Sequence, residues 1–195
     1  MLKKIGIGLA ALLAVLAIAI ATRPATFAVS RSAVIAAPPE VIYAQIHDLR
    51  RWPRWMSYDR MDPAMRRTYE GPATGVGSAY HYVSARVGEG RMTIASLTPN
   101  ERVGVQARFI KPFAATNQVE FTLKPAPGGV RVTWAMQGRN NVMSKTMSLF
   151  IDMDRMIGGD FEKGLADLKT LSEGEARAAS AQPAPAQTTP AGAAS

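Results

Sequence analysis

The fold is decided by residues 102–137, which read RVGVQARFIKPFAATNQVEFTLKPAPGGVRVTWAMQ. Three segments of this stretch alternate apolar and polar side chains, as half-buried strands do: Arg102–Ile110, Gln118–Lys124 and Val130–Gln137. A Lys-Pro dipeptide and a Pro-Ala-Pro-Gly-Gly run separate the three segments and provide turn residues. This spacing predicts consecutive strands of a meandering antiparallel sheet with one apolar face.

Four more strand-like segments precede this stretch: Phe27–Ile35, Met65–Glu70, Ser78–Ala85 and Arg91–Leu97. A short helix is expected to begin at Ala37-Pro38-Pro39-Glu40, because proline is tolerated in the first turn, and to stop at Trp52-Pro53. The residues Val87-Gly88-Glu89-Gly90 are expected to form a turn. We therefore expect a sheet of about six to seven strands.

The periodicity changes after the sheet. Between Lys145 and Leu171, apolar residues recur every three or four positions, which predicts one long helix, kinked or closely packed at Gly158-Gly159. One long helix after about seven strands predicts an α+β fold, in which a curved antiparallel sheet wraps around the C-terminal helix.

The N-terminus carries a membrane signal. Lys3 and Lys4 precede an uncharged run, Ile5–Thr22, which is about 27 Å long as a helix and nearly matches a bilayer core of about 30 Å. A retained anchor is favoured, because signal-peptide cores are usually about 7–15 residues long; cleavage after Ala19-Ile20-Ala21 is the alternative. Either way, the chain is expected at the bacterial inner membrane, with its domain on the periplasmic side, tethered by one span or released by cleavage near Ala21.

The chain is thus expected to have three parts. Residues 1–23 form the anchor or signal, residues 24–172 form the folded domain, and residues 173–195 form a tail rich in alanine and proline. The tail has no aromatic or large aliphatic side chain, so disorder is expected there.

Composition excludes much catalytic chemistry. The 195 residues include no cysteine, which rules out disulfides, zinc–thiolate sites and thiol nucleophiles. The only histidines, His47 and His81, lie in no HExxH or other paired-ligand spacing, and there is no GxSxG. A strand-like segment follows the glycine-rich residues 71–77, which argues against a phosphate loop. We expect no metal, no cofactor and no identifiable catalytic set, and, for an exported protein without a reading helix, no nucleic-acid partner.

Ten methionines have two interpretations, a gap-filling core or a deformable apolar lining for a ligand. A sheet wrapped around one helix often encloses space, on the order of several hundred Å³ in small-molecule sites. The residues expected to line such a cavity are Trp52, Trp55, Tyr80, Tyr82, Met92, Ile94, Phe109, Trp134, Met136, Met153 and Ile157.

The whole chain has a formal net charge of +8, and five arginines near the first helix stand out: Arg50, Arg51, Arg54, Arg66 and Arg67. They are expected to form either an ordinary solvated face or a basic patch that attracts anionic lipid headgroups at the membrane surface.

The residues from Phe27 to Leu171 resemble a START-like, polyketide cyclase/dehydrase-type domain of the SRPBCC superfamily. The matching stretches are Phe27–Ile35, Ala37-Pro38-Pro39-Glu40-Val41, Asp48-Leu49, Trp52 and Trp55, Asp62-Pro63, Thr68-Tyr69-Glu70-Gly71-Pro72, Gly75-Val76-Gly77, Val87-Gly88-Glu89-Gly90-Arg91-Met92, Pro99-Asn100-Glu101-Arg102, Lys111-Pro112-Phe113, Val132-Thr133-Trp134 and Asp160-Phe161-Glu162-Lys163-Gly164-Leu165. The resemblance implies a helix-grip fold that encloses an apolar cavity. Members of that superfamily include lipid and sterol carriers, ubiquinone-binding proteins, ligand-responsive proteins and aromatase/cyclases.

Three functions are compatible with this sequence. The favoured one is a membrane-tethered binding protein that holds a hydrophobic or amphipathic molecule, such as a lipid or quinone, in an internal cavity. The second is an enzyme of the cyclase/dehydrase type, which requires buried titratable groups such as Tyr80, Tyr82 or Arg108. The third is an envelope stress or partner-binding protein whose cavity is vestigial.

Overall fold

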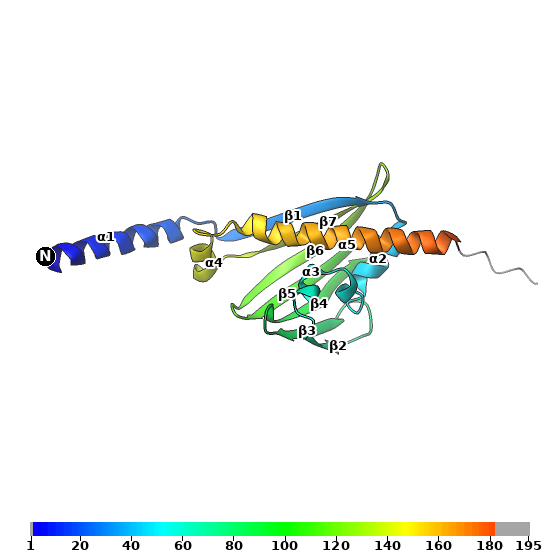
Figure 1. Cartoon of the computed structure of the whole chain (residues 1–195), viewed down its shortest axis with the longest axis horizontal. Coiled ribbons are helices and arrows are strands. Elements are labelled where there is room, and N and C mark those ends of the chain that lie inside the picture. The colour runs from blue at the N-terminus through cyan, green and yellow to red at the C-terminus, as the bar shows by residue number, and fades with distance from the viewer. Residues whose placement is uncertain (1, 182–195) are drawn as a thin grey trace, which may run out of the picture.

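The computed structural model describes residues 2–181 (Figure 1). The helices are α1 (Leu2–Ala21), α2 (Pro39–His47), the single-turn 3₁₀ helix η1 (Trp52–Arg54), α3 (Ser57–Met61), α4 (Val142–Met147) and α5 (Met153–Ala181). The strands are β1 (Thr26–Ile35), β2 (Arg66–Glu70), β3 (Ala79–Ser84), β4 (Gly88–Thr98), β5 (Arg102–Lys111), β6 (Ala115–Ala126) and β7 (Gly129–Arg139).

The seven strands form one antiparallel sheet in the order β1-β7-β6-β5-β4-β3-β2. Strands β2 to β7 form a meander, and β1 joins its far edge by pairing with β7 from Thr26↔Arg139 to Ile35↔Val130. The structure confirms the α+β fold, with the sheet packed on the long C-terminal helix.

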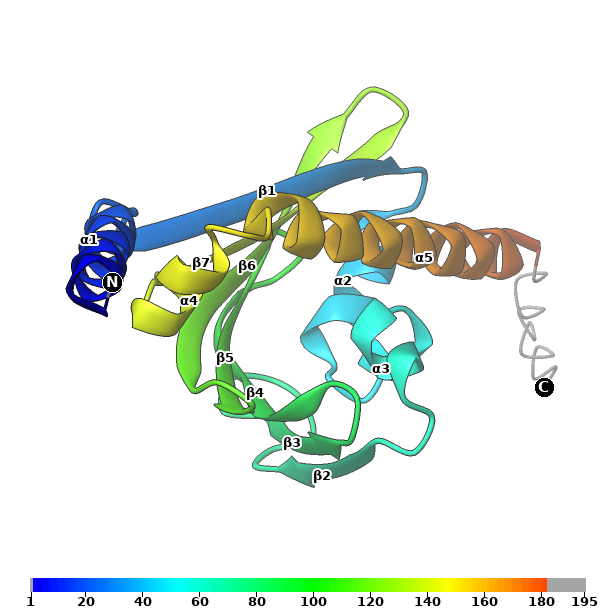
Figure 2. The ribbon, with the colours of Figure 1, turned by 60° about the vertical axis from the view of Figure 1, so that its left-hand side comes forward.

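The sheet curves around the helices (Figure 2). Helix α5 runs across the concave face along β1, and α2, η1 and α3 lie between α5 and the strands at the other edge. Alternation along each strand sends one row of side chains to this concave face, for example Val103, Val105 and Ala107 of β5, all of which are buried.

The two ends of the strands have different surroundings. The end at which β1 begins (Thr26) and β7 ends (Arg139) is called the proximal end, because only residues 22–25 separate it from α1. The opposite end, at which β1 ends (Ile35) and β7 begins (Gly129), is called the distal end. Helix α4 lies at the proximal end, between α1 and the sheet, and it contacts α1 (Figure 1).

Helix α1 packs its side chains against almost nothing. Its residues Lys3–Ala21 are long and apolar enough to cross a membrane, and none of that window is buried in the protein. An exposed apolar helix at the N-terminus fits either a signal sequence or an anchor.

The prediction of one helix from residue 145 to residue 171 is wrong in its first part. Helices α4 and α5 are separate, and the loop 148–152 lies between them. Each begins at a side-chain cap: Asn141 Oδ1 accepts a hydrogen bond from Ser144 N at 2.8 Å, and Asp152 Oδ1 accepts one from Arg155 N at 3.0 Å. The Gly158-Gly159 pair does not interrupt α5.

The predicted tail begins too early. Helix α5 continues to Ala181, because Glu173 and Glu175 hold its last turns against the domain. Glu173 accepts a hydrogen bond from Ala36 N at 2.9 Å, and Glu175 accepts one from Arg54 at 2.8 Å. The rest of the predicted tail, residues 182–195, lies outside the described residues.

Residues 88–90, expected in a turn, are the first residues of β4. Gly90 pairs with Tyr82 across β3 and β4, and a Cβ at position 90 would lie 2.5 Å from the Tyr82 hydroxyl oxygen. Glycine at this position therefore makes room for a tyrosine on the concave face and does not mark a turn.

Candidate ligand-binding site

The eleven residues predicted to line a cavity all belong to one hydrophobic cluster between the sheet and α5. Eight of them are buried, and Met92, Phe109 and Met153 are partly buried. The cluster brings the predicted residues together, and their burial differs between its distal and proximal parts.

The distal part is filled by aromatic rings. The Trp55 ring lies 5.9 Å from Phe121 and 5.8 Å from Trp134, measured between centroids, and both pairs meet edge to face. Trp134 in turn stacks on Phe161 of α5 at 4.1 Å, with only 10° between the ring planes. Such contacts are favourable beyond the burial of area alone, so this half is a packed core.

Hydrogen bonds fix two of the three indoles. Trp52 Nε1 donates to Ile46 O at 2.8 Å and Trp55 Nε1 donates to Gln45 O at 3.1 Å, so the C-terminal carbonyls of α2 hold η1 over the distal sheet. The Trp134 indole N–H is buried and has no hydrogen-bond partner among the described residues. Burial without a partner is costly for such a donor.

The predicted interior is therefore not hollow over its whole length, because the distal half is occupied by Trp52, Trp55 and Phe121, each at most 2% exposed. The proximal half is less covered. In this half, the sheet contributes the half-buried Met92 and Phe109 and side chains of β6 and β7. The first turns of α5 cover them. Flexible thioether and aromatic side chains thus form the less covered part of this concave face.

Asn117 is a polar residue of this proximal face that the sequence analysis missed. Its amide group donates to the Met136 sulfur at 3.6 Å, while its carbonyl oxygen is buried without a partner among the described residues. Gly138 makes room for it, since a Cβ there would collide with Asn117 Oδ1. The signal was present in the alternation of β6, where position 117 shares a face with Val119 and Phe121.

A buried ion pair between Arg67 of β2 and Asp59 of α3 lies at the β2 edge of the sheet. Arg67 Nε donates to Asp59 Oδ1 at 2.7 Å, and the other Asp59 oxygen has no partner among the described residues. Burial raises the pKa of Asp59, and the Arg67 guanidinium opposes that rise. Burial likewise raises the pKa of the nearby Tyr82 phenol to about 12, so this hydroxyl stays protonated at neutral pH.

The groups that an enzyme would need are only partly assembled. Tyr80 and Tyr82 are buried on the concave face, as the cyclase/dehydrase alternative requires. Arg108 is exposed, because its neighbours Ala107 and Phe109 take the inward positions of β5.

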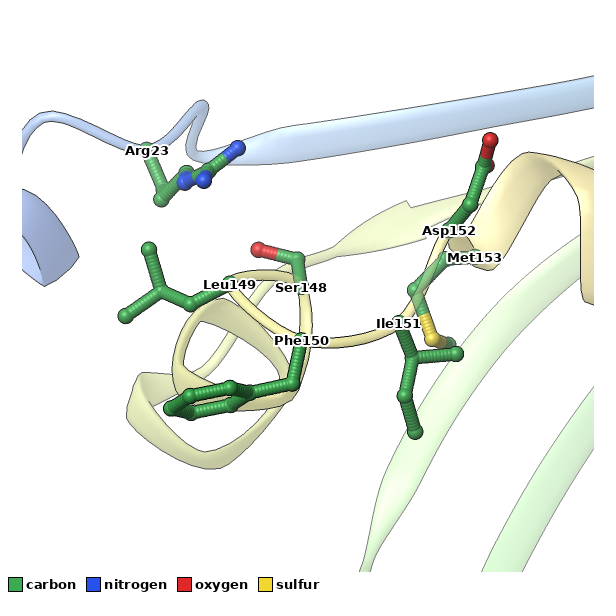
Figure 3. Close-up of a pocket in the computed structure, with 7 residues that line it drawn as sticks. All are labelled: Arg23, Ser148, Leu149, Phe150, Ile151, Asp152 and Met153. Atoms are coloured by element: carbon green, nitrogen blue, oxygen red, sulfur yellow. The ribbon is translucent and has the colours of Figure 1, made fainter.

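A surface pocket of about 420 Å³ lies at the proximal end, between the linker that follows α1 and the loop that joins α4 to α5 (Figure 3). It is lined by Arg23, Ser148, Leu149, Phe150, Ile151, Asp152 and Met153. Leu149 points toward Arg23, whereas Ile151 and Met153 point from the loop toward the sheet (Figure 3). One cationic group thus stands beside apolar side chains at the end of the domain nearest to α1.

A second pocket of about 420 Å³ lies at the same end. Its lining is Thr26, Phe27, Ala28, Thr116, Gln118, Gln137, Gly138 and Arg139. Most of these side chains alternate away from the concave face, so this is a hollow in the outer surface of the sheet.

The structure divides the five arginines predicted as one basic patch. Arg67 is paired with Asp59 inside, and Arg51 and Arg54 pair with Glu175 near the C-terminal end of α5. The Arg50 guanidinium lies 4.6 Å from the Tyr69 ring centre, and Arg66 is exposed at the proximal end of β2. These contacts leave no single cationic surface made of the five.

Within residues 2–181, no three His, Asp or Glu side chains are arranged to hold a metal ion. His81 contacts Glu89 at 3.2 Å on the outer side of β3, and His47 stacks on Tyr43 with 4.7 Å between ring centres. Local contacts within the fold account for both histidines.

The comparisons with known proteins agree with this geometry. Residues 26–173 match the model of a family described as polyketide cyclase / dehydrase and lipid transport. The chain belongs to this family. The match spans the whole sheet and most of α5. No curated protein matches the chain.

Solved structures share the fold at low identity. Protein CV1439 from Chromobacterium violaceum is 19% identical, with a TM-score of 0.54 over 77% of this chain and 99% of that chain. The Aha1 dimer from Colwellia psychrerythraea is 18% identical, with a TM-score of 0.54 over 75% of this chain and 96% of that one. The di-domain ARO/CYC StfQ from the steffimycin biosynthetic pathway is 11% identical, with a TM-score of 0.59 over 78% of this chain and 52% of StfQ.

Proposed function

We propose that this family member is a membrane-tethered binding protein that holds a hydrophobic or amphipathic molecule, such as a lipid or quinone, in the proximal half of its concave face. One observation carries the proposal: the loosely covered, methionine-containing half of the interior is the half that lies next to α1. Aromatic rings that meet edge to face fill the distal half instead.

Burial of apolar surface supplies the affinity in this proposal. Each Å² of apolar ligand surface removed from water contributes about 25 cal/mol, from which the cost of immobilising the ligand is subtracted. Met92, Phe109 and Met153 are partly exposed in this structure and would be covered by such a ligand. The unpartnered Asn117 Oδ1 on the proximal face offers one acceptor for a polar group of the ligand.

We place the domain on the periplasmic side of a bacterial inner membrane. Lys3 and Lys4 precede the apolar run of α1, and basic residues favour the cytoplasmic side. Alkaline phosphatase fused after Ala181 is expected to be active in a bacterial host, and an inactive but stable fusion would contradict this orientation. Mass spectrometry of the intact chain distinguishes a retained anchor from cleavage near Ala21.

The binding proposal is tested by native mass spectrometry of the full chain released from membranes in mild detergent. We expect an added mass of a lipid or quinone that is lost when the protein is denatured. An independent titration with N-phenyl-1-naphthylamine, a small apolar fluorophore, is expected to show saturable enhancement of its fluorescence.

The matched variants are Phe109→Arg and Val76→Arg. The first places a charge in the proximal half, while the second changes an apolar side chain that is 59% exposed in the distal β2–β3 loop. We expect Phe109→Arg to weaken fluorophore binding about tenfold or more, equivalent to about 1.4 kcal/mol, and Val76→Arg to leave it unchanged. No bound mass together with equal titrations for both variants would contradict the proposal.

A further inference from the structure

The apolar residues around α4 form an exposed surface at the proximal end. Five large hydrophobic side chains between residues 142 and 156 are exposed, with Phe150 at 79% and Val142 at 73%. We call them the α4 patch: Val142, Met143, Phe150, Ile151 and Met156. Contiguous exposed apolar surface of this kind marks an interaction site.

The α4 patch lies close to the apolar helix α1, which points to a lipid bilayer as its partner. Helix α4 contacts α1, and the four residues 22–25 join α1 directly to β1. Figure 1 shows α4 between α1 and the sheet, at the end of the domain that α1 leaves. A bilayer that contains α1 must therefore begin within a short distance of the patch, because four residues span at most about 14 Å.

Charge favours the same partner. Arg23, Arg139, Lys145 and Arg155 surround the patch and have no ion-pair partner among the described residues. Two acidic residues lie beside the patch: Asp154 is paired with Arg31 at 2.9 Å, and the exposed Asp152 accepts a hydrogen bond from Arg155 N at 3.0 Å, so the basic groups outnumber the acidic ones four to two. Apolar side chains bordered by unpaired basic groups match the boundary between acyl chains and anionic headgroups.

We propose that the α4 patch is seated in the headgroup–acyl boundary of the bilayer leaflet from which α1 emerges, so that the proximal half of the concave face is held against anionic lipid. This inference rests on the part of the proposed function that keeps α1 in the membrane. It adds a second membrane contact, which fixes the orientation of the domain and brings the half-buried Met92 and Phe109 to the bilayer side.

Site-specific labelling tests the contact in the full chain. Because the protein has no cysteine, single substitutions Met143→Cys, Phe150→Cys, Leu12→Cys and Glu101→Cys each give one site for an environment-sensitive fluorophore. The labelled proteins are reconstituted in vesicles of equal parts phosphatidylcholine and phosphatidylglycerol, with and without lipids that carry a quencher on the acyl chain. Glu101 is exposed in the distal β4–β5 turn and is the control for a site away from the membrane.

We expect blue-shifted emission and quenching by the labelled lipid at positions 143 and 150, as at position 12, and neither at position 101. Quenching at position 12 without quenching at 143 and 150 overturns the inference and leaves the tether intact. Quenching at 143 and 150 but not at 12 supports the patch and contradicts the tether. A label at 150 that is blue-shifted but not quenched by lipid indicates a protein partner or a second copy, and it overturns the inference.

A charge substitution gives an independent readout. With the fluorophore at position 143, Phe150→Glu is expected to abolish quenching by lipid, and Val76→Glu, at another exposed apolar site at the distal end, is expected to leave it unchanged. Both side chains are exposed, so neither substitution removes core packing, and circular dichroism checks that the fold is retained. Equal quenching in the two variants would overturn the inference.

Discussion

The distal and proximal halves of the concave face are made by the same strands and differ in what covers them. Strand β4 supplies Ile94, which is 1% exposed, to the distal half and the partly buried Met92 to the proximal half. The distal half is covered by α2 and by the indoles of η1, which are hydrogen-bonded to α2. The proximal half lies beneath the first turns of α5, where Met153 is only partly buried.

This difference separates stability from binding within one core. A packed aromatic cluster anchors the sheet to α5 at the distal end, so the proximal end can remain loosely covered without unfolding the domain. Ligand sites in proteins are usually mostly apolar concavities with a few placed polar groups, which describes the proximal half better than the distal one.

The largest expected effect compares one side chain from each half. Trp55→Ala removes a fully buried indole and its hydrogen bond to Gln45, and we expect a loss of about 3–5 kcal/mol in the free energy of unfolding. Met92→Ala removes a partly buried side chain from the proximal half, and we expect a loss of about 1 kcal/mol. Urea unfolding of the full chain in mild detergent, followed by circular dichroism, measures both, and equal losses would mean that the two halves are packed alike.

Two glycines of α5 give a smaller effect on stability, and replacing each by alanine is expected to change the free energy of unfolding in opposite directions. A Cβ at Gly164 would lie 2.7 Å from Trp134 Cζ3, so Gly164→Ala is expected to cost about 1–3 kcal/mol by overpacking the distal core. At Gly159 no atom lies within 4 Å of that position, and Gly159→Ala is expected to stabilise the helix by about 0.5–1 kcal/mol. Thermal unfolding of both variants is the measurement, and a neutral Gly164→Ala would show that the contact with Trp134 relaxes easily.

Periodicity was sufficient to predict the sheet and the buried face of several of its strands. Alternation placed Trp134 and Met136 on the same side of β7, and both are buried against α5 or its neighbours. The predicted turn at residues 88–90 was wrong because glycine can mark a turn or make room for a neighbouring side chain. Gly90 indicated a turn by its composition, yet it lies within β4 because the Tyr82 ring occupies the space of a Cβ.

Capping and ion pairs explain the errors at the C-terminus. The Asp152 cap was visible in the sequence and could have separated α4 from α5, but a continuous apolar period obscured it. Residues 173–181 lack large apolar side chains and are nevertheless helical, because the Glu175 carboxylate contacts Arg54 at 2.8 Å and Gln45 at 2.6 Å. Such contacts join residues more than a hundred positions apart and have no local signal.

Local patterns also could not predict which part of the interior is packed. Trp52 and Met92 were equal candidates for a cavity wall, since hydrophobicity and alternation are the same for a filled core and for an open one. The outcome depends on Trp52 Nε1 reaching the Ile46 carbonyl, a contact set by the path of the chain after α2.

The smallest expected effect tests whether the two halves move independently. Arg31 on β1 holds the start of α5 over the proximal half, through Asp154 at 2.9 Å and Glu162 at 2.8 Å. Arg31→Met is expected to speed amide hydrogen exchange a few fold at residues 153–157 and to leave residues 165–168, which lie beyond Glu162, unchanged. Arg155→Met, which removes an exposed arginine of the same turn that has no ion pair among the described residues, is the matched control.

Acid should reproduce the Arg31→Met effect in the unchanged protein. The Arg31 guanidinium lowers the pKa of Asp154 in the folded state. The contribution of the pair is therefore present above the pKa of the unfolded chain and is lost as the pH falls through the lower, folded value. The amides of residues 153–157 are expected to lose their protection from exchange in that acidic range before those of residues 165–168 do, once the intrinsic pH dependence of exchange is subtracted. Simultaneous loss in both segments would show that the proximal half opens only when the distal core unfolds, and the comparison between them would fail.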